Sequence, residues 1–323
     1  MTSTEQPHRS TSTPRFQHQA LFYRSLAEFV SATTGFITDG LSAGEPVLVV
    51  VNAAKIEALR TELGGDAARV QFADMAAVGQ NPARIIPAWQ RFTDRHLRAD
   101  QPVRGIGEPI WATRSADELV ECQGHETLLN LAFDQGPAWT LLCPYDVVGL
   151  PADVVAEAQR SHPHLLDGDQ HSSSPDYVHD HPAPARWDQP LPPAPTDCDR
   201  YAIDRQGQNL EFIRHVAHSH ALAAGLTVDQ AEALTIAVSE MATNAVRHGA
   251  GTATMRVWTR EQSLICEIAD EGRLQATPLL GRQLPHPQQG GGRGFWLAHH
   301  LCDLVQLRTG AGGTTVRLHV YRR

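Results

Sequence analysis

The sequence predicts two domains of different class, an N-terminal α/β domain with a parallel sheet and a C-terminal α+β sandwich. Between residues 16 and 166, strand-like apolar runs alternate with amphipathic stretches, which is typical of parallel strands joined by helices. From residue 200 to 323 the order changes to two helices, a hairpin, a loop, a helix and two more strands. Residues 167–199 are dense in Pro, His, Ser and Asp, and we interpret them as a linker.

Continuous apolar runs define the strands expected in the first domain. The run at 46–51, PVLVVV, is the clearest, because a strand buried on both faces needs apolar residues at every position. Ser115 is placed to cap a helix. Residues 1–15, rich in Ser, Thr and Pro, are expected to be a disordered arm. Strands are expected at 19–23, 46–51, 69–75, 103–111 and 139–145, and helices at 25–44, 54–63, 83–99, 115–133 and 151–161.

Two long helical patterns open the second domain. Thr227 is placed to cap the second helix, and Gly249 is expected to end it. The pattern predicts helices at 209–226, 227–249 and 295–303, a hairpin of 252–260 with 263–272, and strands at 304–309 and 314–322.

Composition excludes several classes of protein. The 323 residues carry a formal net charge of −9, whereas a general nucleic-acid binder normally presents a basic face. The five cysteines include no CxxC pair, which argues against a disulfide framework or a cysteine zinc site. The N-terminus lacks the apolar core of a secretory signal, and no run of about 18 apolar residues occurs. We therefore expect a cytoplasmic protein that does not span a membrane.

Histidines are frequent at the end of the first domain and in the linker. Two interpretations are open, a metal-binding tract or a hydrophilic linker in a His-rich chain. We prefer the second because the spacing is not that of a tetrahedral site. The histidines are His162, His164, His171, His179 and His181.

Glu240 and Asn244 are the first candidate pair for chemistry. They lie four residues apart and therefore on one face of the predicted helix. The amide oxygen of Asn244 suits Mg²⁺, and the carboxylate of Glu240 could accept a proton from an attacking hydroxyl. Taken alone, such a pair is more often a solvated polar face.

Asp270 and Gly272 follow an apolar strand. A carboxylate at this point could accept a hydrogen bond from an adenine amino group, and Gly272 would let the backbone approach the base. An ordinary Asp/Gly turn is the alternative. Thr314 or Thr315, after a glycine turn, could bond the adenine edge directly or through water, although a plain strand start is the simpler interpretation.

A run of glycines leads directly into the third helix. Exposed backbone amides at a helix N-terminus favour phosphate, and Arg293 adds a positive charge. A flexible lid is a compatible interpretation. No GKS or GKT sequence occurs, so this is not a Walker A loop. The glycines are Gly290, Gly291, Gly292 and Gly294.

Taken together, these segments resemble the GHKL ATPase superfamily, and most closely its anti-sigma factor serine kinases. The resemblance covers about residues 205–323. The family's first glycine box usually has a second glycine where this chain has Leu274. The N box resembles Glu240…Asn244, the first glycine box Asp270-Glu271-Gly272, the second Gly292-Arg293-Gly294, and the last Gly313-Thr314-Thr315.

The first domain resembles the MEDS sensory domain, which is related to RecA-like ATPases. The similar segments are residues 18–23, 36–50, 104–111, 126–130, 141–146 and 161–166. No Walker A lysine occurs in this half, so nucleotide binding is not expected there. A ligand pocket at the carboxyl ends of the strands is one interpretation and structural roles are the other, with core or turn roles favoured for Trp111 and Cys143. The residues concerned are Glu108, Trp111, Cys143, Tyr145 and His162.

These resemblances imply an ATP-dependent regulator of the anti-sigma type. It would phosphorylate a Ser or Thr of a partner antagonist, sequester a sigma factor, or do both, under control of the N-terminal domain, which would sense a small molecule or a protein. Anti-sigma kinases of this type are often homodimers. In the implied site Glu240 is the base, Asn244 binds Mg²⁺ and Asp270 anchors adenine. Thr314 or Thr315 bonds the adenine edge, and Gly272 lets the backbone approach the base. Gly292, Arg293 and Gly294 hold the phosphates of ATP.

Two alternatives stay open at this point. Leu274, in place of the second glycine, favours a binding module that uses nucleotide only as a conformational ligand or uses none. An atypical sensor histidine kinase would carry its phosphoryl group on His215, His218 or His220 of the helix at 209–226, although that helix lacks the usual acidic and Arg-Thr-Pro residues after the histidine.

Overall fold

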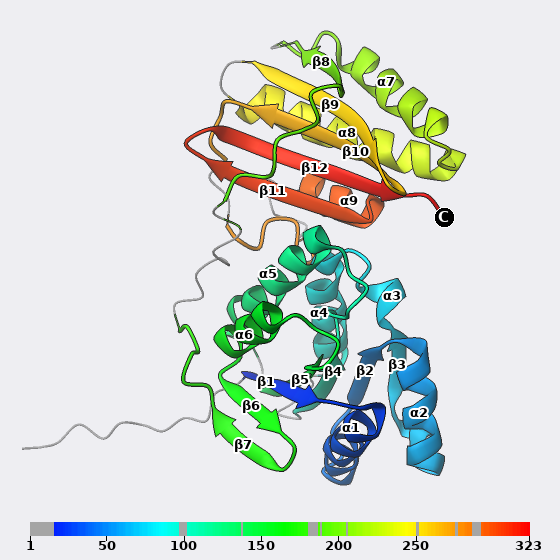
Figure 1. Ribbon diagram of the computed structural model, residues 1–323, viewed down its shortest axis with the longest axis vertical. Coiled ribbons are helices and arrows are strands. Elements are labelled where there is room, and N and C mark those ends of the chain that lie inside the picture. Colours follow the sequence, from blue (N-terminus) through cyan, green and yellow to red (C-terminus); the bar gives the residue numbers. More distant parts are fainter. Residues whose placement is uncertain are drawn as a thin grey trace, which may run out of the picture.

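The computed structural model shows two sheets, each with its own helices (Figure 1). The arm at 1–15, His181, Gly290 and Gly291 lie outside the residues that it describes. Those residues are 16–96, 102–136, 138–179, 187, 189–204, 206–249, 252–274, 277–285 and 292–323.

The N-terminal sheet has seven strands in the order β3-β2-β4-β5-β1-β6-β7. Every pairing is parallel except that of β6 with β7, which confirms the predicted parallel α/β fold. The strands are β1 (Phe16–Tyr23), β2 (Val47–Val51), β3 (Gln71–Asp74), β4 (Val103–Gly107), β5 (Trp139–Asp146), β6 (His164–Asp167) and β7 (Gln170–Ser173).

Helices cover both faces of this sheet, as Figure 1 shows. The continuous apolar run of β2 supplies both cores. Val49 and Val51 pack in the core with α1 and α2, whereas Val50 packs in the core with α4, α5 and α6. The helices are α1 (Leu26–Ser42), α2 (Ala53–Leu63), α3 (Met75–Val78), α4 (Ile85–His96), α5 (Ala116–Phe133) and α6 (Ala152–Ser161), with 3₁₀ turns at Gly64–Arg69 and Pro82–Arg84.

The C-terminal sheet has five strands in the order β11-β12-β10-β9-β8, and every pairing is antiparallel. Helices α7, α8 and α9 cover one face, which confirms the predicted α+β sandwich (Figure 1). The elements are β8 (Asp199–Ile203), α7 (Leu210–Ala223), α8 (Val228–His248), β9 (Ala253–Arg260), β10 (Ser263–Asp270), α9 (Arg293–Leu301), β11 (Leu304–Gly310) and β12 (Gly313–Tyr321).

Capping residues position the two helices that matter most for function. Ser115 and Glu118 form a capping box at the start of α5, and Thr227 and Gln230 form another at the start of α8. Each Ser or Thr side chain satisfies an otherwise unpaired backbone amide, which contributes about 1 kcal/mol to helix stability. These caps fix where α5 and α8 begin.

Parts of the stretch interpreted as a linker are bound to the sheets. Residues 170–173 form β7, an edge strand whose four side chains are all exposed, so it lacks the apolar pattern from which strands are predicted. Asp199 begins β8, which adds a fifth strand to the second sheet. Arg317 of β12 donates a hydrogen bond to the carbonyl of Pro192, so the proline-rich segment lies against this sheet.

Among the described residues, no helix combines the length and the apolar character needed to cross a lipid bilayer.

Candidate functional site

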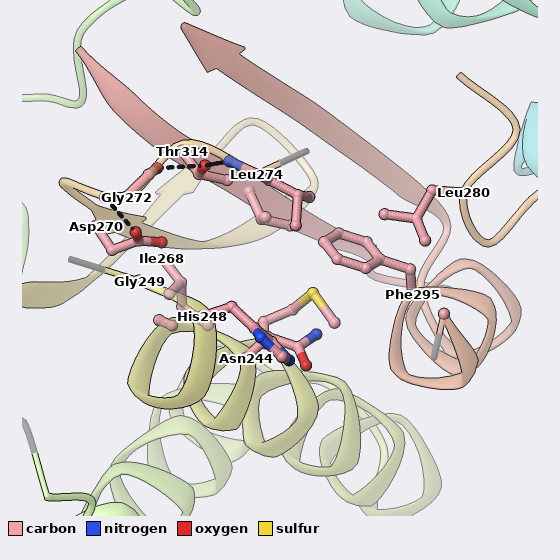
Figure 2. A pocket seen from close by; sticks show the side chains of 14 residues that line it. Asn244, His248, Gly249, Ile268, Asp270, Gly272, Leu274, Leu280, Phe295 and Thr314 are labelled. Carbon is pink, nitrogen blue, oxygen red and sulfur yellow. Dashed lines mark hydrogen bonds between the residues drawn. The ribbon is translucent and has the colours of Figure 1, made fainter. Parts of the chain in front are cut away.

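A pocket of about 240 Å³ opens between α8, the ends of β10 and β12, and the start of α9 (Figure 2). We call it the α8–β10 pocket. Five of the candidate residues line it, from separate elements and turns. The fold therefore brings the helix amide of Asn244 and the strand-end carboxylate of Asp270 together. The pocket is lined by Met241, Asn244, Ala245, His248, Gly249, Ile268, Asp270, Gly272, Leu274, Leu280, Gly292, Phe295, Thr314 and Val316.

Asp270 is the last residue of β10, and its side chain faces the pocket. Its Oδ1 atom accepts a hydrogen bond from the amide of Gly272 at 2.7 Å. Partial burial raises the pKa of Asp270, and the Gly272 amide opposes that shift. One carboxylate oxygen therefore holds the turn, while Oδ2 has no hydrogen-bond partner among the described residues and is left as an acceptor at the pocket wall.

Thr314 fixes the turn that follows Asp270. Its hydroxyl donates to the carbonyl of Gly272 at 2.7 Å and accepts from the amide of Leu274 at 3.1 Å. Gly313 precedes it with φ of +101°, and a β-carbon there would lie 2.1 Å from the carbonyl oxygen of Asp270. Only glycine therefore allows β12 to begin this close to the end of β10.

Thr315 lies outside this pocket. Successive side chains of a strand point to opposite faces, so Thr314 faces α8 while Thr315 faces the outer side of the sheet. There it lines a second cavity together with Arg308 and Arg317. The sequence left Thr314 or Thr315 as candidates for the adenine edge, and of the two it is Thr314 that lines the α8–β10 pocket.

Glu240 and Asn244 face the start of α9. A methyl group on Gly294 would lie 2.8 Å from Glu240 Oε2 and 3.3 Å from Asn244 Nδ2, so only glycine fits between the two helices. Asn244 lines the α8–β10 pocket, whereas Glu240 lies one turn deeper beside Gly294. The pair therefore faces the N-terminus of α9.

Gly292 and Arg293 begin α9. Gly292 has φ of +87° and is the N-cap, a left-handed conformation that favours glycine. Arg293 is the first residue of the helix and is exposed. The first amides of a helix have no partner within that helix, so this end of the pocket presents amide donors to an anion.

The apolar walls of the pocket were not among the candidate residues. Phe295 of α9 and Leu274 and Leu280 of the β10–α9 connection form one side (Figure 2). Ile268 lies two residues before Asp270 and Val316 two residues after Thr314, and strand alternation places each pair on one face. That alternation was the signal available for Ile268 and Val316.

The described part of the β10–α9 connection is bound to the N-terminal domain. Arg282 donates to Glu121 Oε2 of α5, and Arg308 of β11 donates to Oε1 of the same carboxylate, each at 2.9 Å. All three side chains are buried. Gly281, beside Arg282, packs against Phe295 of the pocket wall. This contact joins helix α5 to the wall of the α8–β10 pocket.

The residues considered for a ligand pocket in the N-terminal domain lie in separate groups. Glu108 pairs with Lys55 at 2.5 Å and accepts from Tyr23 at 2.6 Å; burial raises its pKa, and Lys55 opposes the shift. Cys143 and His162 lie elsewhere, fully buried beside β1 and α5. Cys143 lies in the middle of β5 rather than at its carboxyl end.

Comparison with known proteins also divides the chain into an N-terminal and a C-terminal domain. Residues 17–163 match the family model described as MEDS, the methanogen/methylotroph, DcmR sensory domain, and residues 205–320 match the histidine kinase-like ATPase domain. No curated protein matches the chain. A crystal structure of the RsbU and RsbW domains of Rv1364c from Mycobacterium tuberculosis matches at 20% identity with a TM-score of 0.30. That match covers 40% of this chain and 33% of the other, so it spans one third of that protein's length.

Proposed function

We propose that this chain, which joins a MEDS domain to a histidine kinase-like ATPase domain, is an ATP-dependent protein kinase of the anti-sigma type. It binds Mg-ATP in the α8–β10 pocket and phosphorylates a Ser or Thr of a partner antagonist protein in the cytoplasm. It also sequesters a sigma factor. The observation that carries the proposal is that Asn244, Asp270 and Gly292 line one pocket.

The adenine of ATP occupies the β10 end of the pocket. Asp270 Oδ2 accepts a hydrogen bond from the exocyclic amino group, and Gly272 leaves room for the base. The apolar walls formed by Leu274, Leu280 and Phe295 cover the ring. A mostly apolar pocket with a few convergent polar groups is typical of a small-molecule site.

The phosphates occupy the end formed by Asn244 and the start of α9. Mg²⁺ usually takes one or two protein oxygens and fills its octahedron with water and phosphate oxygens, so the Asn244 amide oxygen is a sufficient protein ligand. The amides at Gly292–Gly294 and the positive end of α9 offset the phosphate charge. Arg293 adds a cation at the same helix end.

Glu240 acts as general base. The serine or threonine oxygen of the partner attacks the γ-phosphorus, the bond to the β–γ bridging oxygen breaks, and ADP leaves with that oxygen. The hydroxyl proton passes to the Glu240 carboxylate. Phosphoryl transfer depends mainly on positioning and charge neutralisation, which Mg²⁺, Asn244 and α9 supply. The place of Glu240 beside Gly294 supports this role.

The N-terminal domain controls the site through two contacts. The first is the Glu121 pair with Arg282 and Arg308. The second is at the far end of α9, where Arg84 donates to the carbonyls of His299, His300 and Cys302 at 2.8 to 3.0 Å. The N-terminus of α9 faces the phosphates and its C-terminus is held by the N-terminal domain, so a shift between the domains reaches the nucleotide through one rigid helix.

Glu240→Gln is expected to lower phosphate transfer by roughly 100-fold or more, because a general base contributes about 10²- to 10⁴-fold. Binding of ATP should change little, since Glu240 does not line the pocket. The measurement is transfer of the γ-phosphate to a purified antagonist protein, beside an ATP titration. Glu232→Gln, exposed on the same helix, is the matched control.

Transfer that is unchanged in Glu240→Gln would remove the base assignment. ATP binding without transfer by the wild type would favour a nucleotide-dependent switch. Acid-labile phosphate on His215, His218 or His220 would favour a histidine kinase instead.

Arg84→Met is expected to destabilise the contact at α9 by about 2 kcal/mol, because charged hydrogen bonds to three helix-end carbonyls are lost. Asn81 still donates to two of these carbonyls, so the helix itself should remain folded. The measurement is hydrogen exchange across residues 293–302. Arg91→Met, an exposed arginine on α4, should leave that exchange unchanged.

A further inference from the structure

A second polar cluster lies inside the N-terminal domain, far in sequence from the ATP site. It consists of His18 on β1, Glu126 on α5, Cys143 on β5 and His162 at the end of α6. One ligand atom from each residue lies within 4.8 Å of the others, and no member is more than 1% exposed. We call these four residues the HECH cluster.

The hydrogen bonds of His18 leave one ring nitrogen free to bind a cation. Asn130 Nδ2 donates to the carbonyl of Ser161 at 2.7 Å, and a carbonyl can only accept. The Asn130 oxygen therefore faces His18 Nδ1 at 3.1 Å and accepts its proton. In a neutral ring the proton on Nδ1 leaves a lone pair on Nε2, which points into the cluster.

A backbone carbonyl orients the ring of His162 in a similar way. Its Nδ1 atom lies 2.8 Å from the carbonyl oxygen of Ala158, so Nδ1 carries the proton. Its Nε2 atom is buried without a hydrogen-bond partner among the described residues and lies 3.3 Å from Glu126 Oε2. In histidines that bind metal, one imidazole nitrogen usually donates to a carbonyl or carboxylate, and the other nitrogen binds the ion.

The spacing of the cluster matches a tetrahedral metal site. His18 Nε2 lies 3.2 Å from Glu126 Oε2 and 3.3 Å from Cys143 Sγ. Metal–ligand bonds of about 2.1 Å in a tetrahedron place neighbouring nitrogen and oxygen ligands about 3.4 Å apart. These separations are close to those of ligands around a common centre, and all four ligand atoms lie within 4.8 Å of one another.

The negative charge of Glu126 also favours a bound cation in the cluster. Among the described residues, no lysine or arginine pairs with Glu126, although its carboxylate is buried. A buried carboxylate without a lysine or arginine partner is costly, and a bound divalent cation offsets that cost.

We propose that His18, Glu126, Cys143 and His162 bind a divalent transition-metal ion of the zinc class. Two imidazoles, a thiolate and a carboxylate are the ligands of Zn²⁺, whereas Mg²⁺ and Ca²⁺ take oxygen ligands. On binding, the Cys143 thiol loses its proton to solvent. Four protein ligands close the coordination sphere, so the ion ties β1, α5, β5 and α6 together rather than activating a water.

The test uses the full-length chain, stripped of metal with a chelator and titrated with Zn²⁺ or Co²⁺. We expect one ion per chain, and with Co²⁺ the charge-transfer absorption of a thiolate ligand. Cys143→Ser should lose that absorption, and His162→Gln should lose stoichiometric binding. His125→Gln is the control, because His125 is equally buried and adjoins Glu126 but lies outside the cluster.

A wild-type chain that binds no ion would overturn the proposal, and so would a thiolate absorption that survives Cys143→Ser. Because a variant may simply fail to fold, the melting temperature of the wild type is measured with and without the chelator. Loss of metal should lower it. Equal melting temperatures together with no bound ion would show that the cluster is an imidazolium–carboxylate network instead.

Discussion

Asp270→Asn is expected to weaken ATP binding by about 10- to 150-fold. The loss corresponds to about 1.5–3 kcal/mol, the contribution of a hydrogen bond to a charged group. Asparagine has the same shape, and its amide oxygen can still accept from Gly272, so the turn after β10 should be kept. The amide nitrogen would then face the adenine amino group, and two donors would oppose each other. Calorimetric titration with ATP measures the change.

The neighbouring residue provides the control for this variant. Glu271 is exposed and does not line the pocket, so Glu271→Gln should bind ATP as the wild type does. If Asp270→Asn and Glu271→Gln gave the same affinity, Asp270 would not be the adenine anchor. An unchanged melting temperature in both variants would show that the comparison concerns binding and not folding.

Glu121→Gln is expected to have the second large effect, a loss of about 3–5 kcal/mol in the contact between the domains. Removal of one partner from a buried ion pair leaves the other charge uncompensated. Here two arginines, Arg282 and Arg308, would remain buried against a neutral amide, and burial already lowers the pKa of Arg282. Hydrogen exchange of residues 277–285 should rise, because Arg282 holds that segment on α5.

A double-mutant cycle with Arg282→Gln separates this contact from a general loss of stability. If the two side chains interact as the structure shows, the double variant should lose less stability than the sum of the single variants. Asp134→Asn, at the exposed C-terminal end of α5, leaves the Arg282 pair intact and serves as control. Additive effects of Glu121→Gln and Arg282→Gln would mean that the contact does not couple the domains.

The amino-acid sequence was informative where the chain follows regular patterns. The apolar run 46–51 predicted β2, and the spacing of Glu240 and Asn244 predicted their common helix face. The sequence was less informative where the direction of a side chain decides whether the residue faces the pocket. Thr314 and Thr315 are adjacent and chemically alike, and only the register of β12 places the first in the pocket and the second on the other face.

Contacts between distant segments could not be predicted from local patterns. His18 and Cys143 are separated by 125 positions, and the residues expected at a pocket in this domain included His162 and Cys143 but not His18 or Glu126. Glu121 and Arg282 are 161 positions apart and belong to different domains. Strand β7 was missed for another reason, since its four side chains are polar and exposed on both faces. Only the folded chain brings these residues together.

The most direct test of the central claim is calorimetric titration of the full-length chain with ATP, with and without Mg²⁺. The proposal predicts that one ATP binds per wild-type chain and that Mg²⁺ increases the affinity. In Asn244→Ala the increase due to Mg²⁺ should disappear, while Asp270 still holds the base. A wild-type chain that does not bind ATP, or an Asn244→Ala variant with the full Mg²⁺ effect, would contradict it.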